Sequence, residues 1–183
     1  MESNKIKEQL LSALKTGFID ESHLSNPEYV PEILINDQSR NKKVLSTIQR
    51  ELSECDNFII SAAFLTMSGF ASLSNKLFEL REKGVKGKIL VSQYLNFTEP
   101  EALKRLLDFD NISSKIVTED DFHSKGFLFK KGNYYTLIIG SSNLTAKALS
   151  TNQEWNLKVK AHKNSELIKS FQNEFLIAYK KAI

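Results

Sequence analysis

From residue 42 onward the sequence alternates between two periodicities, and this limits the folds open to the chain. Apolar residues recur at helical spacing in segments 42–55, 67–84, 100–109 and 166–182. Between them lie runs that resemble strands, at 56–65, 86–94, 113–119, 124–130, 134–140 and 154–160. Helices and strands in this order predict an α/β sandwich with a central mixed β-sheet flanked by helices.

The first forty residues follow a different pattern. Residues 3–16 carry Ile6, Leu10 and Leu14 at helical spacing, and Pro27 and Pro31 interrupt the segment that follows. We expect residues 1–40 to form a helix and an extended lead-in packed on the domain. Residues 41–183 are expected to form one domain, since 183 residues suit a single core.

Composition excludes several classes of protein. A single cysteine, Cys55, rules out a disulfide within the chain and fits a buried thiol at a helix end. The three histidines are scattered without metal-ligand spacing, so we expect neither a metal nor a cofactor. No segment resembles a signal peptide or an 18-residue membrane span, which favours a cytoplasmic protein without membrane partners. The net charge of +3 permits a nucleic-acid partner without requiring one.

Polar residues gather at the ends of a predicted hairpin. The stretch FHSKGFLFKKGNYYTLIIGSSN contains two apolar runs joined by a Lys-Lys-Gly-Asn turn. His123 and Lys125 stand at the start of the first run, two residues apart and therefore on one side of a strand. Antiparallel pairing returns the end of the second run, with Ser141 and Asn143, to the same place.

These side chains suit a phosphodiester. Lys125, Ser141 and Asn143 can donate to phosphate oxygens, and a neutral His123 can attack phosphorus to form a phosphohistidine. A nucleophilic imidazole needs its second nitrogen held, usually by a carboxylate, and Glu154 is the candidate. Each motif alone is commonplace, because Gly-Ser-Ser-Asn is also a frequent turn composition.

The motifs together resemble the phospholipase D superfamily, whose pattern is His-x-Lys, four residues, Asp, then Gly-Ser-x-Asn. HSK at 123–125 and GSSN at 140–143 match it, and Glu154 falls where related nucleases carry the carboxylate that orients the histidine. Lys130 stands where the family has Asp, and the gap to GSSN is about three residues longer. The strings AFLTMSGF, FHSKGFLF, IIGSSNLTAKAL and NQEWN are similar to phospholipase D-like domains at the N-terminus of bacterial DEAD/DEAH-box helicases, and related domains occur in restriction endonucleases. The resemblance implies a phospholipase D-like nuclease fold over residues 41–183.

A single copy of the motif has a consequence. The attack needs a second group to protonate the leaving oxygen, and neither His23 nor His162 has a matching motif. We therefore expect a homodimer in which His123 and its copy face each other.

The substrate is less determined. Five lysines could contact a nucleic-acid backbone, although lysines at such positions also keep sheet edges soluble. They are Lys130, Lys131, Lys147, Lys158 and Lys160. Tyr134, Tyr135 and Trp155 could stack on bases, but sheet or core packing is the simpler interpretation of each. The sequence favours a metal-independent DNA nuclease, and the resemblance implies that it is fused to or associated with a helicase or restriction system. The alternatives are a catalytically weak nucleic-acid-binding module of a larger helicase and a phospholipase-type phosphodiesterase.

Overall fold

A computed structural model describes residues 2–16, 27–118 and 122–183 of the chain. In this part of the chain a seven-stranded sheet has the strand order β1-β7-β6-β5-β2-β3-β4. The strands are β1 (Glu32–Leu34), β2 (Asn57–Ala62), β3 (Lys86–Ser92), β4 (Ile112–Val117), β5 (Gly126–Lys131), β6 (Tyr134–Gly140) and β7 (Asn156–His162). Neighbours among β2, β3 and β4 are parallel, whereas every other pairing is antiparallel. The predicted mixed sheet flanked by helices is confirmed.

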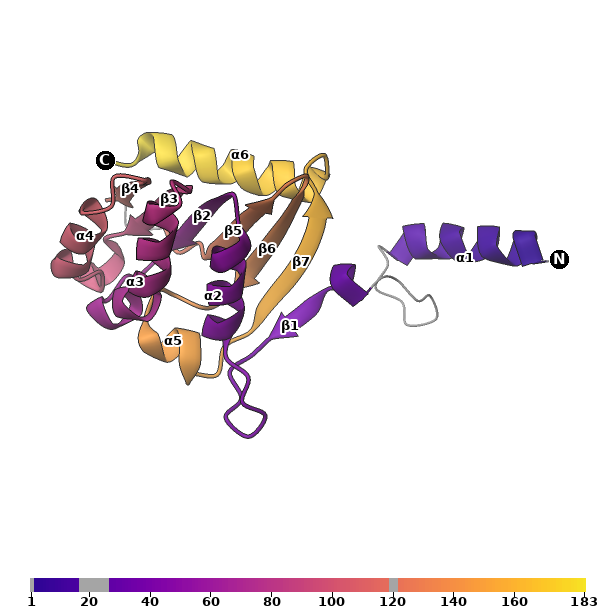
Figure 1. Cartoon of the computed structure of the whole chain (residues 1–183), viewed down its shortest axis with the longest axis horizontal. Coiled ribbons are helices and arrows are strands. Elements are labelled where there is room, and N and C mark those ends of the chain that lie inside the picture. The colour runs from indigo at the N-terminus through magenta and orange to yellow at the C-terminus, as the bar shows by residue number, and fades with distance from the viewer. Residues whose placement is uncertain (1, 17–26, 119–121) are drawn as a thin grey trace.

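Helices cover both faces of this sheet (Figure 1). One face packs against the helices α2 (Val44–Glu54), α3 (Met67–Glu82), α4 (Pro100–Leu107) and α5 (Ala146–Ser150). The core of that face contains the fully buried rings of Phe58, Phe127 and Phe129. The opposite face packs against α6 (Glu166–Lys181), which buries Phe175 and Tyr179 against β-strand residues.

Strand direction places seven strand ends along one side of the sheet, which we call the polar edge. The C-terminal ends of β1, β2, β3, β4 and β6 lie there, together with the N-terminal ends of β5 and β7. Gly126 at the start of β5 faces Ile139 near the end of β6, so the predicted hairpin is confirmed with its expected register. Gly132 makes its turn with a φ of 57°, in the left-handed region that glycine tolerates.

Several elements differ from the prediction. The first hairpin strand begins at Gly126 rather than at residue 124. The last strand, β7, spans Asn156–His162 rather than 154–160, so Glu154 lies in the loop before it. The short helix α5 was not predicted because five residues are too few to show a helical period; Thr145 caps it by accepting a hydrogen bond from the Ala148 amide, 3.1 Å away. The strand β1 was also not predicted, and it pairs with β7 at the sheet edge.

The N-terminal helix α1 (Glu2–Thr16) lies beyond β1, apart from the sheet (Figure 1). Its side chains of Ile6, Leu10 and Leu11 are exposed. Its packing on the domain therefore stays a prediction, as does the boundary at residue 41. Within the described residues, no helix is both long and apolar enough to cross a membrane.

Candidate active site

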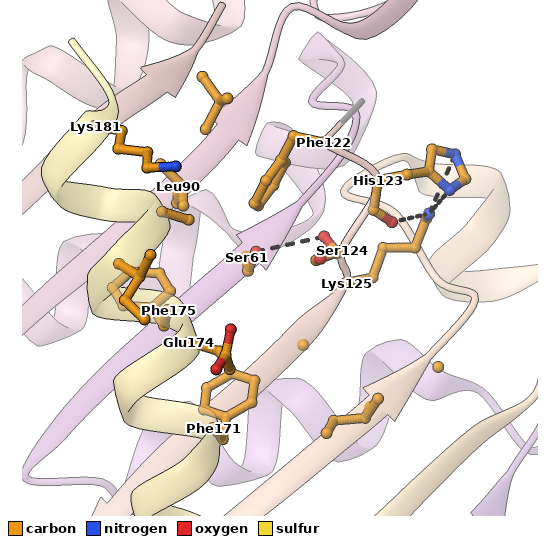
Figure 2. A pocket seen from close by; sticks show the side chains of 16 residues that line it. Ser61, Leu90, Phe122, His123, Ser124, Lys125, Phe171, Glu174, Phe175 and Lys181 are labelled. Atoms are coloured by element: carbon orange, nitrogen blue, oxygen red, sulfur yellow. Dashed lines mark hydrogen bonds between the residues drawn. The ribbon is translucent and has the colours of Figure 1, made fainter. Parts of the chain in front are cut away.

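His123 and Lys125 lie in the segment that leads into β5, not in the strand itself. The Lys125 ammonium nonetheless meets the imidazole, with Nζ 2.9 Å from His123 Nδ1 and 2.8 Å from the His123 carbonyl oxygen. Figure 2 shows both side chains on the same side of this segment, directed away from α6. The two side chains meet, as the sequence predicted, but they do so in the loop before β5 and not on one side of a strand.

Two serines hold the backbone of this segment. The hydroxyl of Ser92, at the end of β3, lies 3.1 Å from the carbonyl oxygen of Phe122, and that of Ser61, in β2, lies 3.4 Å from the carbonyl oxygen of Ser124. Both serines are buried. The sequence analysis did not select these two serines. The feature that could have identified them is a hydroxyl side chain within, or at the end of, an otherwise apolar strand.

The electrostatics favour a neutral imidazole. Burial lowers the pKa of His123, and the nearby charge of Lys125 lowers it further. Burial also lowers the pKa of Lys125, while the negative charge of Glu154 opposes that shift. A histidine with a lowered pKa is unprotonated at one ring nitrogen at neutral pH, which a nucleophile requires.

Asn143 is held by the end of β2. Its side-chain oxygen Oδ1 accepts hydrogen bonds from the backbone amides of Ala63 and Phe64, each at 3.1 Å. Because two N–H donors can bond only to the oxygen, this contact fixes which way the carboxamide points and leaves its NH₂ group as the donor end. The ring of Phe64 also meets the imidazole of His123 edge-on, with centroids 5.7 Å apart, which links the two predicted site residues.

Ser141 and Glu154 form a second pair at the same edge. The Ser141 hydroxyl donates to a carboxylate oxygen of Glu154 and accepts from the amide of Trp155 at 3.1 Å. The contact of Glu154 seen here is thus with Ser141, and its predicted role in orienting His123 stays a prediction.

The predicted nucleic-acid lysines do not cluster around His123. Lys131 forms a 2.6 Å ion pair with Glu54, Lys158 forms one of 3.2 Å with Glu32, and Lys160 bonds Glu28. The positions Lys130, Lys131 and Lys160 lie toward the far end of their strands. Lys147 is exposed in α5, four residues after Asn143.

An apolar cleft of about 620 Å³ lies between α6 and the sheet, behind the same segment (Figure 2). Its apolar walls include Phe122, Ile139, Phe171 and Phe175, the charged residues Glu174 and Lys181 of α6 also line it, and His123 and Lys125 form part of its border. The cleft and the polar site therefore share one stretch of chain.

A metal site has no obvious ligands here. No group of three or more His, Cys, Asp or Glu side chains suited to holding a metal ion occurs within residues 2–16, 27–118 and 122–183. His162 lies at the opposite end of β7 from Glu154 and packs edge-on against Tyr134. His23 lies outside the described residues.

Comparisons with known proteins agree with this architecture. The family model described as "Cardiolipin synthase, PLD-like domain" matches residues 48–177. The fold is similar to the phospholipase D family member Nuc from Salmonella typhimurium, with a TM-score of 0.62 and 16% identity over 84% of this chain and 97% of Nuc. It is also similar to NucT from Helicobacter pylori, with a TM-score of 0.64 and 14% identity over 85% of this chain and 98% of NucT.

A larger protein contains a similar fold. Phosphatidylserine synthase from Haemophilus influenzae matches with a TM-score of 0.66 and 14% identity, over 84% of this chain and 39% of the synthase. No curated protein has a significantly similar sequence.

Proposed function

Because the chain belongs to the phospholipase D-like domain family, we propose that it is a metal-independent phosphodiesterase that acts through a phosphohistidine on His123. The observation that carries this proposal is the contact between the Lys125 ammonium and an imidazole whose pKa is lowered. A cation beside a neutral nucleophile is the arrangement that attack on an anionic phosphodiester requires.

The reaction proceeds in two steps. A neutral nitrogen of His123 forms a bond to phosphorus, the bond from phosphorus to the leaving oxygen breaks, and an acid gives that oxygen a proton. Water then attacks the phosphohistidine and releases the imidazole. Lys125 and the NH₂ group of Asn143 donate to the phosphate oxygens throughout. When Glu154 turns from Ser141 to orient a catalytic imidazole, the single proton of the Ser141 hydroxyl becomes available to the phosphate as well.

The acid is supplied by the His123 of a second copy. This part of the proposal rests on the histidine count, since His162 lies at the other end of its strand and His23 lacks the motif. An exposed apolar row supports a second copy: Ile33, Leu157 and Ile139 are neighbours across β1, β7 and β6. Ile139 also borders the cleft beside His123, so the row reaches the site.

Sedimentation and activity test the dimer together. Leu157→Asp in the row should dissociate the dimer and remove activity. Leu107→Asp, which changes an exposed leucine on α4, is the matched control and should do neither. A fully active wild-type monomer would refute the shared site.

For the substrate we propose DNA, with a helicase or restriction system as the setting. The resemblance of the motif strings to helicase-associated domains supports this, and so does exposed Lys147 beside the Asn143 loop.

In EDTA the wild type should cleave plasmid or single-stranded DNA, whereas His123→Ala should not. His162→Ala, an exposed histidine away from the site, serves as the control. Binding without cleavage by the wild type would favour a nucleic-acid-binding module.

The apolar cleft supports a second candidate. A phospholipase-type enzyme would use such a cleft for the hydrophobic part of its substrate, and the cleft borders His123 and Lys125. Hydrolysis of phospholipid vesicles, with no cleavage of either DNA, would favour this activity.

A further inference from the structure

Trp155 combines an exposed side chain with a fixed backbone. Its side chain is 70% exposed, in contrast to the sheet or core packing that the sequence suggested. Large apolar side chains presented in this way often mark a binding surface, particularly when other apolar side chains surround them. Ile139 and Leu157, both exposed, occupy neighbouring positions on β6 and β7.

The backbone of Trp155 is bound on both sides to Ser141. The Trp155 amide donates to Ser141 Oγ at 3.1 Å, and the Trp155 carbonyl oxygen accepts from the Ser141 amide, also at 3.1 Å. Gly140 permits this approach, because a Cβ there would lie 2.3 Å from the Trp155 carbonyl oxygen. The next residue, Asn156, is buried and donates to Ser142 at 2.9 Å.

This anchoring connects the indole to the proposed chemistry. Ser141 is a proposed phosphate donor, and its hydroxyl bonds Glu154, the residue directly before Trp155. The Trp155 backbone therefore lies beside the proposed phosphate site. Because the backbone is already ordered, little conformational entropy remains to be lost when a ligand packs on the ring.

We propose that Trp155 is a stacking platform for a nucleobase that flanks the scissile phosphate. This inference rests on the proposed phosphodiesterase function and adds a substrate-binding residue to it. A nucleobase is flat and aromatic, and it is joined to a phosphate by a sugar, so one nucleotide can occupy both the ring and the phosphate donors. Stacking on an aromatic side chain accepts every base, which gives affinity for single-stranded nucleic acid without sequence preference.

A second protein copy is the competing occupant, because the row of Ile33, Leu157 and Ile139 adjoins the indole. The backbone contacts favour the nucleobase. They attach Trp155 to Ser141, which bonds Glu154 at the polar edge, whereas the aliphatic row lies one residue inside the strand ends and parallel to them.

Fluorescence can test the proposal directly, since Trp155 is the one tryptophan in the sequence. His123→Ala protein, held at a concentration where sedimentation shows a single species, is titrated with oligothymidylate and with an abasic oligomer of equal length. The bases should quench the emission and the abasic backbone should not. For the variants, which lack tryptophan, affinity is read from the fluorescence anisotropy of end-labelled oligomers. Trp155→Ser should lower the ratio of oligothymidylate to abasic affinity roughly 5- to 150-fold, and Trp155→Phe should restore most of it.

The controls separate the possible failures. Leu107→Ser, at another exposed apolar position, should leave the affinity ratio unchanged. Equal quenching by both oligomers, or an unchanged ratio in Trp155→Ser, would overturn the platform. If Trp155→Ser dissociated the dimer, that result would also overturn the stacking platform, because it would place the indole in the interface between two copies. Hydrolysis of methyl p-nitrophenyl phosphate by the wild type in EDTA reports on the phosphodiesterase proposal separately, because this ester carries no base.

Discussion

Two substitutions of Asn143 should separate its structural role from its chemical role. Its side-chain oxygen accepts from the Ala63 and Phe64 amides at 3.1 Å, and these bonds tie the loop after β6 to the end of β2. Asn143→Ala removes the acceptor of both amides at a partly buried position. Each unsatisfied group costs about 1–2 kcal/mol, so the loss of stability should be about 2–4 kcal/mol.

Asn143→Asp keeps an oxygen for both amides but removes the NH₂ donors and adds a negative charge toward the phosphate. Its stability should stay close to that of the wild type, while kcat/KM for a phosphodiester should fall at least 100-fold, as when one preorganised donor is lost. Urea denaturation measures the stability of each variant, and hydrolysis of methyl p-nitrophenyl phosphate measures its kcat/KM. For Asn143→Ala, the melting temperature should fall by roughly 5–15 °C.

The reasoning about Asn143 would be refuted by either of two results. An Asn143→Asp protein with wild-type activity would show that the NH₂ group does not serve the phosphate. An Asn143→Ala protein with wild-type stability would show that the two amide contacts contribute little to the fold.

Three further predictions follow from single contacts. Removing the nearby charge with Lys125→Met should raise the pKa of His123 toward its ordinary value, so NMR titration should show its protonation at higher pH; an unchanged or lower pKa would contradict this. Gly69→Ala should destabilise the chain by about 1–3 kcal/mol, because the new Cβ would lie 1.8 Å from the Leu144 carbonyl oxygen; an unshifted urea midpoint would contradict that packing. Burial raises the pKa of the Cys55 thiol to about 11, so Ellman's reagent should react with it only after urea unfolds the chain, and rapid reaction in the native state would count against it.

The sequence predicted the fold well where apolar patterning is strong. Continuous apolar runs marked β2 and β3, because strands covered by helices on both faces consist mostly of apolar residues. The hairpin followed from its turn, where Gly132 adopts a positive φ. The strand β1 has no such signature, because its three residues carry little pattern and it forms through pairing with β7.

The site was predictable as a set of residues but not as a set of contacts. Four site residues lie at the same end of the β5–β6 hairpin because its two strands pair in a fixed register. They are His123, Lys125, Ser141 and Asn143. The partner of Glu154 depends on how the loops before β7 and after β6 approach each other, which no local pattern encodes. The pairing of Lys131 with Glu54 likewise arises from contact between elements far apart in the chain, so spacing alone suggested free lysines.

The central claim is that His123 becomes covalently bonded to phosphorus, and rapid-quench mass spectrometry tests it most directly. Wild-type protein would be mixed with methyl p-nitrophenyl phosphate in EDTA, stopped in alkali and digested. The account predicts a transient, acid-labile phosphoryl adduct on the peptide that contains His123, absent from His123→Ala. Turnover without any adduct, or an adduct on a different residue, would contradict the account.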